Sequence, residues 1–460
     1  MKSGSRYAAV VLLCLLGIAS SLVFIRNLID FPVYYSAGKT LLSGRVDLYA
    51  PDFALGQVMD YRYLPLFLVA LVPLWHLPYN FAAFVWYLAN YLCVLVIARS
   101  MYRMFTSEPG RTPATAETGG SNTGLRFATL DRRTRFLPAL ICGLAVAQYF
   151  VMALHYGNAH LIAITLVFIS YQLLQKNRDL NAALAMGAAI LIKLTPVMLL
   201  PYFAIKRRWK YLGLTAVVIG CGALLPSLYF GASTNFGLLR QWFDHVIVNQ
   251  SFHEMNGPIN LALKGQALRY LTNVDYESRV GGDSQYPSVD IVALAPTAVE
   301  KVAIGASILI FVAAILWIWR RTAQGDTRGW YDKLKQTDGS PILDDLEFGV
   351  LICIMLLVGP LTSKIYFVAL VWPVVAVARS IFATPGRTPA SAKALLILVG
   401  IANAVLPLIP GRAAQRLLLV LGVDFYINCA VMLAALILVL ARGNTAVPSS
   451  SAPETALEAS

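Results

Sequence analysis

Residues 79 to 101 read YNFAAFVWYLANYLCVLVIARSM, an apolar run in which Arg99, near its end, is the single charged residue. About 20 consecutive apolar residues form a helix long enough to cross the hydrocarbon core of a bilayer. Runs of this kind recur along the chain, which is 58% hydrophobic and only 13% charged over 460 residues. Water-soluble proteins do not have this composition. The sequence therefore predicts an integral membrane protein.

The number and spacing of the apolar runs predict the architecture. Because a backbone in lipid must satisfy its own hydrogen bonds, we expect an all-α, polytopic protein with about ten to twelve spans. Residues 1–442 form a single transmembrane domain in this interpretation, and the polar tail 443–460 is predicted to be disordered. The apolar runs cover residues 7–25, 64–77, 79–101, 137–153, 158–175, 182–204, 211–230, 298–319, 348–361, 365–382, 394–409 and 417–440.

Basic residues indicate how the chain is oriented. They cluster beside the ends of apolar runs, as in Lys206 to Lys210 and Arg320-Arg321. This distribution is typical of cytoplasmic loops and explains the net charge of +13 without a nucleic-acid partner. With Lys2 and Arg6 inside, the chain has outer loops at 26–62 and 231–296, and we expect interfacial helices in both.

One segment conflicts with this orientation. Twelve crossings place residues 102–136 outside, although their many arginines favour the inside. Two apolar runs could resolve this conflict. Residues 64–77 could enter the membrane without crossing it. Residues 182–204, which are interrupted at Lys193 and Pro196, could form two half-helices. The sequence leaves the choice open.

Two ionisable residues at the ends or breaks of apolar runs are candidates for chemistry. Asp30 follows the first run, at the boundary where a carboxylate stays ionised yet is partly desolvated, so it can act as a general base. Its alternative role is to cap a helix that starts near Pro32. Lys193 interrupts an apolar run, where a cation is costly unless it is paired or faces a polar cavity. For Lys193, function and anchoring both remain open.

Several short segments, in a fixed order, resemble the family 87 glycosyltransferases, mannosyltransferase-like members of the GT-C membrane superfamily. The order carries more weight than any one motif. The sequence departs from the family at Asn158 and His160, where Gln and Asn are usual, and at Ile365, where a His is common. The segments are Asp30 to Gly38, Leu42-Ser43-Gly44, Asp47-Leu48-Tyr49, Tyr61 to Leu66, Gly157 to His160, Ala185 to Pro196, Asn249-Gln250-Ser251 and Gly359 to Tyr366.

The resemblance implies a GT-C-like fold and transfer of a sugar, most simply mannose, from a polyprenyl-phosphate sugar to a lipid-linked or extracytoplasmic glycan acceptor, with inversion. Asp30 is then the general base. A pentose such as arabinofuranose is the alternative sugar. We expect no cofactor and no metal ligands, although the question of a divalent cation stays open. Candidates for binding the donor phosphate are Lys193, Lys364, Arg62, Lys264 and Arg269, and candidates for contacting substrate are Tyr34, Tyr35, Tyr63, Asn158, His160, Asn249, His253 and Tyr366.

Other classes of membrane protein share this composition. A secondary transporter or lipid flippase would show two related halves with paired broken helices, and no convincing internal repeat is visible. A polysaccharide polymerase or ligase would also use a large outer loop and lipid-phosphate substrates. The position of Asp30 and the ordered segments after it favour the sugar transferase, embedded among the lipids of a bacterial inner membrane with its active site on the outer face.

Overall fold

The computed structural model describes residues 3–50, 53–54, 61–106, 132–248, 257–273, 286–324, 341–383 and 388–443, and every regular element in these ranges is helical. Apart from Gly443, the predicted tail lies outside them. In chain order the helices are α1 Ser3–Phe24, η1 Ile25–Asn27, α2 Phe31–Leu42, α3 Pro65–Ala70, α4 Val72–Trp75, α5 Tyr79–Thr106, α6 Arg132–Ala145, α7 Ala147–Tyr156, α8 His160–Leu174, α9 Asp179–Ile192, η3 Thr195–Leu199, α10 Leu200–Ile205, α11 Trp209–Leu224, α12 Ser227–Phe230, α13 Ala232–Trp242, η4 Phe243–Val248, α15 Leu263–Leu271, α16 Pro296–Gln324, α17 Pro341–Val358, η6 Lys364–Leu370, α18 Val371–Ala383, α19 Ala390–Val405, η7 Leu406–Leu408, α20 Arg412–Val420, α21 Val423–Phe425, η8 Tyr426–Val431 and α22 Met432–Gly443.

The lengths and composition of these helices are those of a polytopic membrane protein. In the described part of the chain, 6 helices are long and apolar enough to cross a bilayer, and two bent pairs raise the number to 8. One pair joins the end of α1 to α2 with a bend of 71°, and the other joins α6 to α7 with a bend of 55°. Shorter apolar helices lie between them, at His160–Leu174, Asp179–Ile192 and Thr195–Ile205.

The two ambiguous apolar runs both form broken elements. Residues 64–77 contain α3 and α4, of 6 and 4 residues, which at 1.5 Å per residue are far too short to cross a bilayer. Residues 182–204 contain the end of α9, a break at Lys193 with extended backbone angles (φ −149°, ψ 123°), and the short helices η3 and α10. The polypeptide therefore enters α5 on the side where α1 ends.

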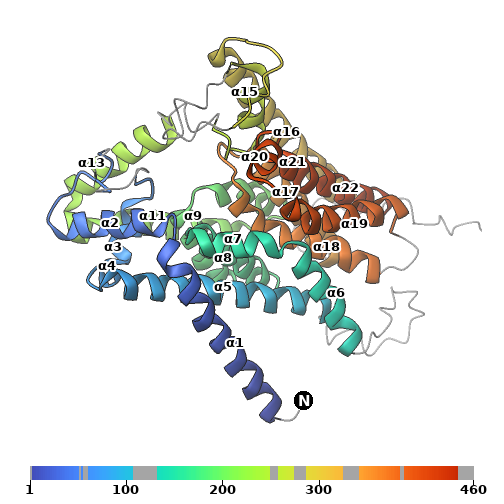
Figure 1. Cartoon of the computed structure of the whole chain (residues 1–460), viewed down its shortest axis with the longest axis horizontal. Coiled ribbons are helices and arrows are strands. Elements are labelled where there is room, and N and C mark those ends of the chain that lie inside the picture. The colour runs from blue at the N-terminus through green and yellow to red at the C-terminus, as the bar shows by residue number, and fades with distance from the viewer. Residues whose placement is uncertain are drawn as a thin grey trace, which may run out of the picture.

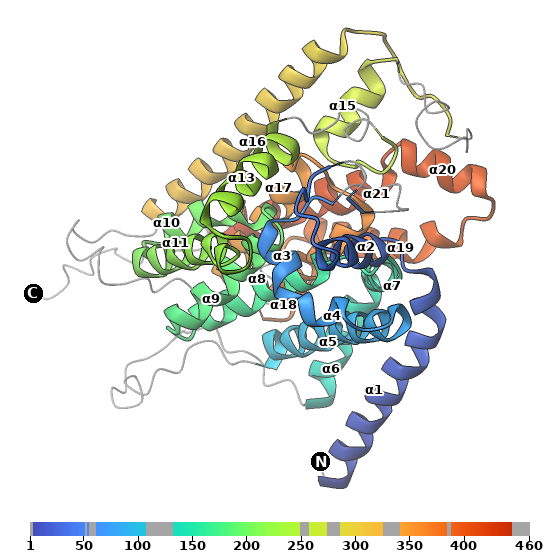
Figure 2. The ribbon, with the colours of Figure 1, turned by 90° about the vertical axis from the view of Figure 1, so that its left-hand side faces the viewer.

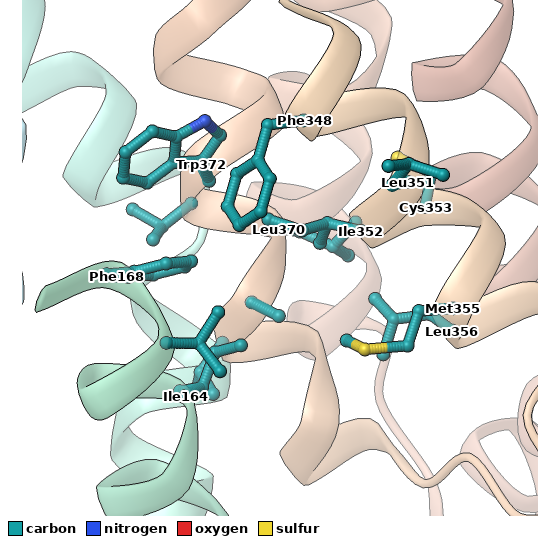
Figure 3. Packing of buried hydrophobic residues seen from close by; sticks show 14 of the residues in the cluster. Ile164, Phe168, Phe348, Leu351, Ile352, Cys353, Met355, Leu356, Leu370 and Trp372 are labelled. Atoms are coloured by element: carbon teal, nitrogen blue, oxygen red, sulfur yellow. The ribbon is translucent and has the colours of Figure 1, made fainter. Parts of the chain in front are cut away.

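The centre of the molecule is a layer of apolar side chains from α8, α17 and α18. Figure 3 shows Phe168 of α8 facing Trp372 of α18 and Phe348 of α17. The Phe168 and Trp372 ring centroids are 5.0 Å apart, and those of Phe348 and Trp372 are 5.4 Å apart. Almost every residue of α17 and α18 is buried. A helix that is apolar on most sides belongs in the interior of the bundle. Helices α17 and α18 pack against each other there, and both contact α22.

Ionic contacts lie at one end of α17. Asp345 pairs with Arg379 at 2.5 Å, and Lys206 lies 2.7 Å from both Asp344 and Glu347. Helix α17 has 18 residues and so is about 27 Å long, close to the thickness of a hydrocarbon core. Just beyond its other end, the Thr362 carbonyl accepts a hydrogen bond from the backbone N–H of Leu261. The molecule thus has two polar layers separated by an apolar one.

The described parts of the two segments expected to form outer loops include α2 and α15. In both views the N-terminus of α1 is at the bottom of the molecule and α15, from the segment 231–296, is near the top (Figures 1 and 2). Helix α2, from the segment 26–62, packs against α4. This packing requires Gly38, because a Cβ atom there would lie 2.4 Å from the Trp75 ring.

Candidate active site

Asp30 lies in the bend between the first helix and α2. Its backbone N–H donates a 2.8 Å hydrogen bond to the carbonyl oxygen of Tyr156, the last residue of α7. Although α2 begins at the next residue, the Asp30 carboxylate makes no capping hydrogen bond to it. The side chain of Asp30 is therefore directed to another partner, and capping is not its role.

The partner of Asp30 is Asn158, whose Nδ2 donates to Asp30 Oδ2 at 2.8 Å. Asn158 follows Gly157, which ends α7 in a left-handed conformation (φ 62°, ψ 31°) that favours glycine. The backbone N–H of His160 donates to Asn158 Oδ1 at 2.7 Å. Because this contact occupies the amide oxygen, the amide nitrogen must face the carboxylate. Asn158 is thus fixed between the end of α7 and the start of α8, and its amide in turn holds the Asp30 carboxylate.

A third break between helices, at the end of α9, brings Lys193 close to Asp30 and Asn158. Lys193 ends α9, and its Nζ lies 3.5 Å from the centroid of the Tyr366 ring. The ring of His160 lies 4.4 Å from that of Tyr366, and neither of its nitrogens makes a hydrogen bond within the described residues. His160 and Tyr366 are buried, whereas Lys193 and Asp30 are half-buried. The two ionisable groups therefore keep access to a substrate while their supports are held inside the protein.

The surroundings of Asp30 affect its protonation. Burial raises the pKa of the Asp30 carboxyl, whereas the hydrogen bond from Asn158 and the positive charge of Lys193 act in the opposite direction. Desolvation disfavours the charged form of a carboxyl group and so makes it a stronger base. A carboxylate of this kind can accept a proton from a hydroxyl group.

Two of the four tyrosines predicted to contact substrate, Tyr34 and Tyr63, form one wall of the site. The hydroxyl groups of Tyr34 and Tyr63 are 2.6 Å apart, and the Tyr63 ring stacks on Phe67 with centroids 4.5 Å apart. Tyr35, the next residue on α2, instead donates to the carbonyl of Leu77 at 2.8 Å. The Tyr35 hydroxyl group is therefore not part of the wall that Tyr34 and Tyr63 form.

The five cations proposed for the donor phosphate occupy different environments. Lys264 pairs with Glu300 at 2.5 Å, and Lys364 pairs with Asp424 at 2.6 Å. The buried guanidinium of Arg269 donates to three backbone carbonyl groups in the segment 257–260. Arg62 is half-buried, and its positive charge lies near enough to Tyr366 to interact with it electrostatically. Lys193 and Arg62 thus lie near Asp30 or Tyr366, while Lys264, Lys364 and Arg269 hold other parts of the protein together.

Two further candidates, Asn249 and His253, lie outside the described residues.

A buried polar cluster around Asp424 was missed from the sequence. Asp424, the partner of Lys364, lies 3.4 Å from the hydroxyl of Tyr149, which also donates to Asn403 at 2.9 Å. Asn428 donates to the same hydroxyl at 2.7 Å. The signal that could have revealed the cluster is the presence of polar residues within apolar runs. No short motif contains these residues, because they come from α7, α19, α21 and η8.

The fold and site define a polytopic membrane protein with a carboxylate, an amide and an amine gathered at three helix breaks. The model of glycosyltransferase family 87 matches residues 61–334, more than half of the chain, and the chain belongs to this family. The matched region contains Asn158 and Lys193, whereas Asp30 precedes it and Tyr366 follows it. No curated protein matches the chain, and no solved structure does.

Proposed function

We propose that this glycosyltransferase moves a sugar, most simply mannose, from a polyprenyl-phosphate sugar to a hydroxyl group of a lipid-linked or glycan acceptor, with inversion. The observation that carries the proposal is the meeting of Asp30, Asn158 and Lys193 at one point. A carboxylate and an amine serve the two ends of a displacement: the carboxylate accepts the proton and the amine receives the leaving phosphate. Membership of family 87 supports the reaction class.

Asp30 is the general base of this mechanism. Its Oδ2 accepts the hydrogen bond from Asn158, and its remaining lone pairs accept the proton of the acceptor hydroxyl as that oxygen attacks the anomeric carbon. The bond between the anomeric carbon and the phosphate oxygen breaks, and polyprenyl phosphate leaves with the bonding electrons. A single displacement of this kind inverts the anomeric centre and requires one carboxylate.

Lys193 stabilises the phosphate that leaves. In the structure its ammonium lies over Tyr366, a contact that contributes about 0.5 to 2 kcal/mol. A charge-assisted contact with a phosphate oxygen is stronger than this. The Tyr366 ring keeps the ammonium in position while a phosphate oxygen binds to it, and Arg62 lies close enough to Tyr366 to contribute a second positive charge.

The arrangement of the helices supports an active site on the outer face. Because α3 and α4 do not cross the membrane, α5 runs from the side of Asp30 to the opposite side, where its last turn contains Arg103. Lys206 and Arg321 also lie at that opposite end, in contact with the acidic start of α17. Basic residues favour the cytoplasmic side. This orientation removes the conflict over the basic segment 102–136 and fits a bacterial inner membrane.

The first experiment measures transfer of label from radiolabelled polyprenyl-phosphate-mannose to a membrane lipid extract by the full chain in nanodiscs. We expect Asp30→Asn to lower the rate by about 10²–10⁴, the contribution of a general base. Asp47→Asn is the matched control, because Asp47 is exposed and pairs with Arg45 on the surface. It should transfer label at the wild-type rate.

Two results would count against the proposal. Equal transfer by Asp30→Asn and the wild type would remove Asp30 from the mechanism while leaving the donor class intact. Absence of transfer from both a mannose and a pentose donor would overturn the donor class. A parallel reaction with a chelator tests whether a divalent cation takes part.

A further inference from the structure

A cavity of about 130 Å³ lies between α5 and α8, at the end of these helices away from Asp30. Arg99 on α5 is twenty residues beyond Tyr79, whose ring contacts Tyr35 at 5.2 Å, so the cavity lies about 30 Å along the helix from that contact. Ser100 donates to Gln172 at 3.3 Å and joins the two helices beside the cavity. Neither residue takes part in the proposed transfer reaction.

Three basic side chains line the cavity: Arg99, Arg103 and Lys176. All three are exposed. Arg99 and Arg103 are one helical turn apart, where like charges destabilise each other. Within the described ranges no ion pair is formed by Arg99 or Lys176, and both side chains line the cavity. The electrostatic environment is therefore that of an anion site.

The lining also contains three apolar residues, which lie to one side of the basic ones. Val96, Ile169 and Leu173 also line the cavity. Val96 precedes Arg99 on α5, and Ile169 of α8 precedes Lys176, which follows the end of α8, so the apolar side chains lie nearer the middle of each helix. From the bilayer centre outward, the cavity thus passes from apolar to cationic within about 10 Å. A phospholipid has the same sequence of chemistry, from acyl chain to phosphate.

We propose that this cavity binds the phosphate group of an anionic phospholipid from the cytoplasmic leaflet, with an acyl chain against Val96 and Ile169. Basic pockets between membrane helices on the cytoplasmic side are suited to such headgroups. Free inorganic phosphate would satisfy the same cations, but it would leave the apolar part of the lining without a partner. The apolar lining therefore favours the lipid.

The test compares two double variants of the full chain, each of which removes two positive charges. Arg99→Gln with Lys176→Gln alters the cavity, whereas Arg207→Gln with Arg320→Gln alters exposed residues elsewhere at the same end of the molecule. Native mass spectrometry of protein extracted from membranes then counts phospholipid that stays bound. Loss of two basic contacts should weaken retention of anionic phospholipid roughly 30-fold in the cavity variant alone. Equal retention by both variants would overturn the proposal.

A second measurement identifies the source of the phosphate. Short-chain phosphatidylglycerol, phosphatidylcholine and inorganic phosphate are titrated separately while the Tm is followed. We expect only phosphatidylglycerol to raise the Tm of the wild type and the control variant, and not that of the cavity variant. An equal rise of the Tm with inorganic phosphate would show a site for a free anion and overturn the proposal of a lipid ligand. An equal rise of the Tm with phosphatidylcholine would show that the site does not recognise the charge of the headgroup.

Further controls separate this inference from the proposed transferase reaction. Sugar transfer should be unchanged in both double variants, because the cavity is remote from Asp30. If the Gln variant fails to fold, the exchange Arg99→Lys with Lys176→Arg keeps both charges and should retain phosphatidylglycerol binding. Failure of that charge-preserving variant, in a folded protein, would also count against the site.

Discussion

Asn158 donates a 2.8 Å hydrogen bond to Asp30, from which it is separated by 128 residues of sequence. Each residue lies at a helix boundary: Asp30 precedes α2, and Asn158 lies between α7 and α8. The two boundaries are joined independently by the backbone hydrogen bond from Asp30 to Tyr156. The position of the carboxylate is thus fixed by main chain and side chain together.

The contact between Asn158 and Asp30 predicts a positioning role for the amide. Asn158→Ala removes a hydrogen bond to a charged group, worth about 1.5 to 3 kcal/mol, and kcat should fall roughly 10- to 100-fold. The KM for the donor should change little, because Lys193 remains in place. Asn235→Ala is the control, since Asn235 is a buried amide bonded to Ala223 and Ser227 instead. An unchanged kcat, or a defect confined to KM, would contradict this role.

The environment of Asp30 predicts the pH dependence of transfer. The base must be ionised, so kcat/KM should fall as the pH drops through the pKa of Asp30, which burial raises above its ordinary value. Loss of the Asn158 hydrogen bond, or of the Lys193 charge, raises that pKa further. The acid limb of the profile should therefore move to higher pH in Asn158→Ala and in Lys193→Gln. A move to lower pH in either variant would show that Asp30 is not the group that titrates.

The contact between Lys193 and Tyr366 predicts different effects for two substitutions of the ring. Tyr366→Phe keeps an aromatic face under the ammonium and should leave the KM for the donor within about twofold of the wild type, whereas Tyr366→Leu should raise it by roughly 2- to 30-fold. The measurement is initial rate against donor concentration. If Phe and Leu gave the same KM, the ring would not be what holds Lys193.

The pair Asp345 and Arg379 predicts a large effect on stability far from the site. Both side chains are buried, and removal of one partner leaves an isolated charge, at a cost of about 3 to 5 kcal/mol. Arg379→Met should therefore lower the Tm clearly in detergent. The double variant with Asp345→Leu should recover most of the loss, because neither charge then remains. If the double variant were no more stable than Arg379→Met, the pair would not account for the effect.

The sequence alone determined the class of the protein. Composition and the lengths of apolar runs are local quantities, and they identify a helical membrane protein because each span satisfies its own backbone hydrogen bonds. The sequence also singled out Asp30 and Lys193, since an ionisable residue at the edge or break of an apolar run is conspicuous. It could not choose between capping and another role for Asp30, because both fit the same local pattern.

Only the tertiary structure decided how the candidates are used. The sequence proposed Lys264, Lys364 and Arg269 as phosphate ligands beside Lys193, yet the first two pair with Glu300 and Asp424 and the third binds backbone carbonyl groups. The runs 64–77 and 182–204 had two possible forms, and packing chose the broken one in each. The physical reason is the same throughout: a charge or a helix break is a local property, whereas its partner is supplied by segments far away in the chain and brought close by packing.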